Sequence, residues 1–189
     1  MNKFLEEIQE QPEALKQTFC YYRSEEGKKS LKTVCALWKS GEYDRIVFTG
    51  MGSSYFISQA AATMISSASI PASAINAGEL LHFQSPSLTE RTLLIAVSQS
   101  GESYEVKQRR LPITVIGITN ESGSSLAVMA THCLLCKAGK EEMTSTKTFI
   151  TTYLAVYLLA ESLKRHEVNE EALDGIIREV ERQLAERDT

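Results

Sequence analysis

The stretch that decides the fold is "TLLIAVSQSGES", residues 92–103, in which an apolar run leads directly into serines and a glycine. From Leu93 to Val97 no side chain is polar, and such a run predicts a strand covered on both faces, as strands of parallel sheets are. An earlier stretch, "RIVFTGMGSS" at residues 45–54, has the same form. Together they predict two strands of one sheet, each ending in a loop of small polar residues.

Strands and helices alternate along most of the chain. This alternation predicts an α/β fold, a three-layer α/β/α sandwich with a five-stranded parallel sheet. The strand at 70–76 is placed near an edge of the sheet because it contains Pro71. The other predicted strands are 112–120 and 132–137, the second of them buried, and the predicted helices are 28–41, 54–68, 77–85, 102–110, 124–131 and 145–166.

Helical segments flank the predicted sheet at both ends of the chain. Residues 4–19 place apolar side chains roughly on one helical face, with an interruption at Pro12. We predict N-terminal helices over 1–41 that pack on a domain at 42–166, followed by a C-terminal amphipathic helix over 167–189. The last helix either docks on the domain surface or tethers the domain to another module.

Composition excludes several classes of protein. The 189 residues carry a net charge of −4, with lysine and arginine scattered, so no basic patch for nucleic acid or an acidic membrane is predicted. The sequence has no run of about 18 apolar residues, which is the length needed to span a bilayer. The polar, acidic N-terminus is not typical of a secretory signal. We therefore expect a cytoplasmic protein whose partners include neither nucleic acid nor membrane.

The cysteines Cys133 and Cys136 have C-x-x-C spacing, which could indicate a redox or zinc pair. They lie inside a predicted strand, and no second pair of this spacing accompanies them. We interpret them as buried free thiols in a reducing cytoplasm. No metal and no cofactor is predicted.

The two polar loops suit an anion. Gly50 and Gly52 let the backbone turn tightly and approach a ligand, and Ser53 and Ser54 add hydroxyls at the start of the following helix. The first turn of a helix has unpaired N–H groups and a partial positive charge. The loop with Ser98, Ser100 and Ser103 repeats the arrangement, so both loops are predicted to bind one phosphate. The alternative is that the serines only cap two helices.

Two nucleotide-binding motifs are not met. A Walker loop needs a lysine after its second glycine, and neither loop has one. The dinucleotide fingerprint has glycine at a third position, which is Tyr55 here.

Three motifs in this order, "GMGSSY", "SQSGES" and "TSTKTF", resemble the sugar isomerase (SIS) domain family, and within it the first SIS copy of the glutamine–fructose-6-phosphate aminotransferases and related sugar-phosphate isomerases and deglycases. The resemblance covers nearly the whole chain. It implies a flavodoxin-like sheet and a phosphosugar ligand. Carried over by position, the implied contacts are Gly52, Ser53, Ser98, Gln99, Ser100 and Ser103, with Ser54, Thr144 and Ser145 as further lining of the pocket.

The resemblance also implies a function. It makes the chain one half of a sugar-phosphate isomerase, aminotransferase-type or deglycase enzyme that acts as a homodimer or with a second SIS domain. The alternative is a non-catalytic module that senses a phosphosugar. Members of this type carry two SIS domains in tandem, with the acid–base groups largely in the second, and this chain has one.

The catalytic residues are therefore left unassigned. A glutamate in the third loop lines the active site in the family, and here Glu141, Glu142 or a residue of a partner domain could take its place. His82 is the candidate histidine, with an ordinary surface histidine as the alternative. Which sugar binds is not encoded in any motif.

Overall fold

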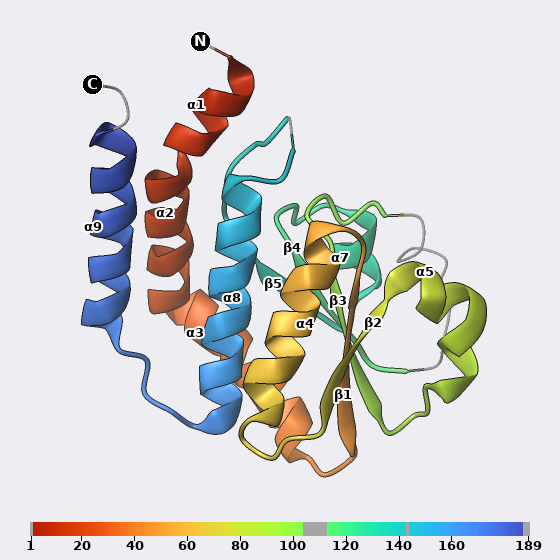
Figure 1. Cartoon of the computed structure of the whole chain (residues 1–189). Helices are drawn as coiled ribbons and strands as arrows, with labels where there is room; N and C mark the ends of the chain where they lie inside the picture. The colour runs from red at the N-terminus through yellow and green to blue at the C-terminus, as the bar shows by residue number, and fades with distance from the viewer. Residues whose placement is uncertain (1, 104–112, 143, 187–189) are drawn as a thin grey trace.

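The computed structural model of the chain describes residues 2–103, 113–142 and 144–186, and in it five parallel strands form one sheet in the order β2-β1-β3-β4-β5 (Figure 1). The predicted α/β fold with five parallel strands is confirmed. The strand order reverses at β1, because the chain runs from β1 outward to β2 and then back past β1 to β3. The strands are β1 (Arg45–Gly50), β2 (Ala72–Asn76), β3 (Thr92–Val97), β4 (Val115–Thr119) and β5 (His132–Leu135).

The central strands are the most apolar and the most deeply buried. Every residue of β3 is buried, as is every residue of β1 after Arg45. β2 lies at the edge, as Pro71 predicts, and is only partly buried. Proline lacks an N–H but keeps its carbonyl, and Pro71 accepts a hydrogen bond from the Ile46 N–H at 2.8 Å.

Helices cover both faces of the sheet (Figure 1). On one face, Phe48 and Ile95 belong to a large apolar cluster with side chains of α4, α8 and α3. Val47 and Leu94, the neighbours of those residues along each strand, point to the other face and pack with Leu80. The helices of the first face are α3 (Glu25–Lys39), α4 (Ser53–Ser66) and α8 (Lys147–Lys164), and those of the second are α5 (Ala77–Glu79), the short turns Leu80–Gln84 and Ser85–Ser87, and α7 (Ser125–Met129).

The terminal helices form a further layer outside α8 (Figure 1). The chain begins with α1 (Lys3–Gln9) and α2 (Gln11–Arg23), and α2 packs against α8. The last helix, α9 (Glu170–Glu186), packs against α2 and buries Ile177 there. Exposed ion pairs such as Arg23–Glu170, at 2.7 Å, accompany this contact and contribute at most about 1 kcal/mol each. The domain limits at 42 and 166 remain a prediction.

The elements differ from the predictions at a few places. The predicted segment 77–85 is not a regular helix, because its middle part forms a wider π-type turn. The strand predicted over 132–137 is shorter and lies at the sheet edge, so that of its four residues only Leu134 is buried. The helix predicted over 102–110 falls mostly outside the described residues. None of the helices in the described part of the chain has the length and hydropathy that crossing a bilayer requires.

Two phenylalanines in different surroundings test the core. Phe48 is fully buried between the sheet and its helices, whereas the Phe83 side chain is 80% exposed. Phe48→Ala is expected to lower the free energy of unfolding by about 3–5 kcal/mol, since it removes buried apolar contacts and leaves a cavity. The control, Phe83→Ala, is expected to change it by no more than about 0.5 kcal/mol. Urea unfolding followed by circular dichroism measures both, and equal losses would contradict this description of the core.

Candidate functional site

The candidate site begins with two strand ends that lie next to each other. β1 and β3 are hydrogen-bonded neighbours, with Thr49 opposite Ala96 in register. Paired strands are about 4.8 Å apart. The loops that follow them, 51–54 and 98–103, therefore leave the same edge of the sheet side by side, which is where open α/β sheets bind ligands.

The first loop leads into the N-terminus of α4, where the Ser54 and Tyr55 N–H groups donate to the Met51 and Gly52 carbonyls. Gly52 has a positive φ of 52° and occupies the N-cap position of α4. No side chain in the described part of the chain caps this helix, so Ser53 and Ser54 are not its caps. Both serines are half-buried. Gly50 packs closely on this first turn, because a Cβ there would lie 2.9 Å from atoms of Ser54.

The second loop is held together by its own serines. Ser98 is buried, and its Oγ accepts a hydrogen bond from the Gly101 N–H at 3.2 Å and lies 3.0 Å from the Ser103 Oγ. Ser100 is exposed, and its Oγ accepts from the Glu102 N–H. These hydroxyls stabilise the turn, and the helix that the capping alternative assigns to them, 102–110, falls mostly outside the described residues.

The neighbouring segments fix the second loop. The Gln99 carbonyl accepts hydrogen bonds from the Thr119 Oγ1 and from the Asn120 N–H, both at 3.0 Å. Gly101 has a positive φ of 65°, and a Cβ there would lie 2.1 Å from the Ser124 Oγ. Only glycine fits at this point, and its carbonyl accepts from Leu126 in α7. The Glu102 carboxylate accepts hydrogen bonds from both the N–H and the Oγ of Ser125.

The third loop, which connects β5 to α8, has its two glutamates in structural contacts. The Glu141 carboxylate accepts hydrogen bonds from the N–H and the Oγ1 of Thr146, both at 2.8 Å, and from Thr148, so it caps α8. Glu142 is exposed and pairs with Lys140 at 2.7 Å, which lowers the pKa of its carboxyl. Sequence reasoning left these two glutamates as alternatives for the active site and did not identify the capping role of Glu141.

The other candidate residues predicted from the sequence are Thr144 and Ser145 of the third loop and the histidine His82. Thr144 is exposed, and Ser145 is half-buried with its Oγ 2.8 Å from the Thr148 Oγ1. His82 is exposed on the turn Leu80–Gln84, beside Phe83. That position agrees with the surface histidine given above as the alternative.

A groove joins the second and third loops. Gln99 and Ser100 line one side of it, and residues 139–141 line another. Its volume is about 980 Å³, and the rest of its wall is formed by Gln17, Cys20, Tyr21, Asn120, Glu121 and Lys137.

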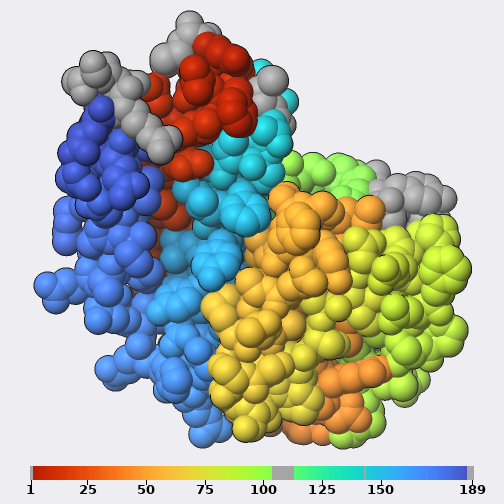
Figure 2. All heavy atoms as spheres, in the orientation of Figure 1, coloured from red at the N-terminus to blue at the C-terminus, as the bar shows by residue number. Residues whose placement is uncertain are grey.

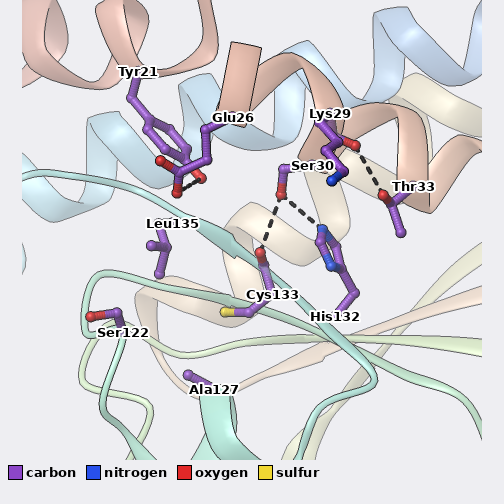
Figure 3. Close-up of a pocket in the computed structure, with 10 residues that line it drawn as sticks. All are labelled: Tyr21, Glu26, Lys29, Ser30, Thr33, Ser122, Ala127, His132, Cys133 and Leu135. Carbon is purple, nitrogen blue, oxygen red and sulfur yellow. Dashed lines mark hydrogen bonds between the residues drawn. The ribbon is translucent and has the colours of Figure 1, made fainter. Parts of the chain in front are cut away.

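A second, smaller hollow contains a serine and a histidine in contact (Figure 3). The Ser30 Oγ lies 2.8 Å from the His132 Nε2 and 3.3 Å from the Cys133 carbonyl oxygen, to which it can donate, so it ties α3 to β5. Burial lowers the pKa of His132 and raises the pKa of the Cys133 thiol to about 11. A thiol with such a pKa is protonated at neutral pH and is a poor nucleophile.

The C-x-x-C pair has no partner for redox or metal chemistry in the described residues. Cys133 and Cys136 are free, and burial raises the pKa of Cys136 to about 12. Cys136 is fully buried and Cys133 is half-buried. Within the described ranges, no group of three or more His, Cys, Asp or Glu side chains could hold a metal ion.

The chain resembles known proteins over most of its length. The family model described as SIS domain matches residues 42–162. The glutamine–fructose-6-phosphate aminotransferase (isomerizing) of Pyrococcus horikoshii is 34% identical over 166 residues, which is 84% of this chain and 27% of that protein. The chain thus spans little more than a quarter of this curated relative.

Solved structures share the fold. The C-terminal domain of glucosamine-fructose-6-phosphate aminotransferase from Francisella tularensis aligns with a TM-score of 0.72 and 26% identity, over 98% of this chain and 54% of that one. The Vibrio vulnificus NanR protein complexed with ManNAc-6P aligns with a TM-score of 0.63 and 21% identity, over 84% of this chain and 60% of that one.

Two glycines test the packing of the second loop. Gly101→Ala is expected to lower the free energy of unfolding by roughly 1–3 kcal/mol, because alanine is strained at positive φ and its Cβ would collide with Ser124. Gly123→Ala is the matched control, since nothing lies within 4 Å of a Cβ there. Thermal unfolding of both variants compares them. A Gly101→Ala protein as stable as Gly123→Ala would show that the loop does not depend on this close approach.

Proposed function

The chain belongs to the SIS domain family, and from this membership we propose that it binds a phosphosugar through the loops that follow β1 and β3. The observation that carries the proposal is the position of these loops on adjacent strands, with the uncapped N-terminus of α4 at one of them. The Ser54 and Tyr55 N–H groups already donate to the Met51 and Gly52 carbonyls, so this helix start offers an anion its partial positive charge and the N–H groups before Ser54. The structure of NanR, which is a complex with ManNAc-6P, supports the same ligand class.

The proposed phosphate contacts are neutral donors. Neither loop contains lysine or arginine, so the attraction comes from main-chain amides and hydroxyls. A hydroxyl has one proton and two lone pairs, so Ser98 can accept from Gly101 and still donate to a phosphate oxygen. The proposed contacts are Gly52, Ser53, Ser54, Ser98, Gln99, Ser100 and Ser103, with Thr144 and Ser145 toward the sugar.

We propose that the acid–base groups come from outside this chain. Isomerisation between an aldose and a ketose moves a proton between adjacent carbons and needs a general base. Glu141 is occupied by donors at the start of α8, and Glu142 is exposed and paired with Lys140. A second SIS domain, in another copy or in a longer protein, would supply the base. Turnover of fructose 6-phosphate by a dimer of this chain, but not by its monomer, would favour the enzyme half over a module that only senses the ligand.

The proposed pairing surface is formed by α4 and α8. These helices lie side by side, and together they form a continuous part of the face in Figure 2. Each carries an exposed aromatic side chain, Phe56 at 64% and Tyr153 at 43%. Exposed apolar groups of this size commonly mark interfaces.

We also propose that the protein is located in a reducing cytoplasm, because its cysteines are free.

The phosphate contacts are tested by removing two hydroxyls. The double variant Ser98→Ala/Ser100→Ala is expected to bind fructose 6-phosphate at least about tenfold more weakly in isothermal titration calorimetry, because each hydrogen bond to a charged group contributes roughly 1.5–3 kcal/mol. Ser66→Ala/Ser67→Ala makes the same chemical change at the other end of α4 and should leave the affinity unchanged. Undiminished binding by the first double variant would refute the proposed site.

The pairing surface is tested by a charge on α4. If the chain pairs with a second copy, Phe56→Glu is expected to shift sedimentation from dimer to monomer, since a carboxylate would have to be desolvated at the interface. Val128→Glu is the control, because Val128 is 79% exposed on α7 at the other face of the sheet. Analytical ultracentrifugation at equal concentrations compares the two. A Phe56→Glu protein that sediments like the wild-type dimer would exclude this surface.

A further inference from the structure

Asn120 lies directly after β4, between the second and third loops. Its side-chain Oδ1 accepts a hydrogen bond from the Ala138 N–H at 2.7 Å, and its Nδ2 donates to the Gly139 carbonyl at 2.7 Å. The amide of one side chain therefore satisfies both a donor and an acceptor of the third loop, much as a neighbouring strand would.

The segment that Asn120 holds has an unusual backbone. Lys137 is not glycine but has a positive φ of 54°, and Gly139 follows at 73°. A left-handed conformation is unfavourable for a residue other than glycine and persists where the surroundings hold it. The two bonds from Asn120 lie within this kink, so they are placed to hold it.

Asn120 also contacts the second loop, but through its main chain. Its N–H donates to the Gln99 carbonyl at 3.0 Å, and this bond does not involve the side chain. Asn120, Gln99 and Gly139 line the same groove. One residue thus links the loop proposed to bind phosphate with the loop that carries Thr144 and Ser145.

The far end of the third loop is fixed separately. Glu141 caps α8 through Thr146 and Thr148, and the Glu142 N–H donates to the Glu7 Oε1 at 2.6 Å. Residues 144 and 145 follow these contacts closely. The third loop is thus anchored at Asn120 on one side and at Glu7 and the start of α8 on the other.

We propose that Asn120 is a positioning residue, which holds the third loop against the phosphate-binding loop so that Thr144 and Ser145 face the sugar part of the ligand. The inference rests on the proposed function. It assigns Asn120 no contact with the ligand, and it separates two properties: affinity for the phosphate group, which the second loop provides, and added affinity for the sugar, which the third loop provides.

The test compares two ligands on the whole chain. Asn120→Ala is expected to bind fructose 6-phosphate about tenfold more weakly, since two neutral hydrogen bonds are lost and the competent loop position is less populated. Its affinity for inorganic phosphate should stay within about twofold of the wild type, because the main-chain bond to Gln99 remains. Amide hydrogen exchange of the ligand-free protein should become faster at residues 138–142.

Ser30→Ala is the matched control. It also removes a side chain that bridges two segments, and Ser30 is not in the proposed site. It is expected to lower the melting temperature while leaving both affinities unchanged. Where Asn120→Ala does not fold, Asn120→Asp serves instead, because it keeps the acceptor for Ala138 and loses the donor to Gly139.

The outcomes are distinct. Equal loss of affinity for both ligands, or no loss for fructose 6-phosphate, would overturn the role of Asn120. A wild-type chain that binds neither ligand would refute the proposed function itself, and the inference with it. If Asn120→Ala loses affinity for fructose 6-phosphate but not for inorganic phosphate, and amide exchange in the third loop becomes faster, the proposal is supported.

Discussion

The parallel pairing of β1 with β3 is the constraint on which the candidate site depends. The chain crosses from β1 to β2 on one face of the sheet and returns to β3 on the other, so the strand order reverses at β1, next to β3. In open α/β sheets a crevice forms at such a reversal. The serines and glycines of both loops therefore follow neighbouring strand ends at the same edge of the sheet.

The chemistry of these loops follows from close packing of the backbone. Gly50 fits against the first turn of α4, and Gly101 fits against Ser124, where any larger residue would collide. Because the packing is tight, the hydrogen-bond donors available at these loops are main-chain amides and short hydroxyls. Such donors suit a negatively charged ligand. The net charge of −4 does not oppose this, because the attraction is local and short-ranged.

The third loop shows how side chains with catalytic potential can serve structure instead. Glu141 satisfies the donors at the start of α8, and Lys147 is buried and paired with Glu10, from the N-terminal helices. Both Glu141 and Lys147 are thus engaged in structural contacts. This favours a division in which binding groups lie here and acid–base groups lie in a second SIS domain.

The sequence alone determined the strands at 92–97 and 45–50, the edge position of the strand with Pro71, and the two polar loops, because apolar runs, proline and glycine act through their immediate neighbours in the chain. It also singled out the serines of both loops. It could not choose between Glu141 and Glu142, nor show that Asn120 binds Ala138 and Gly139, nor that Phe56 on α4 is exposed. Those outcomes depend on distances between segments far apart in sequence, which are fixed only when the sheet and its helices are assembled.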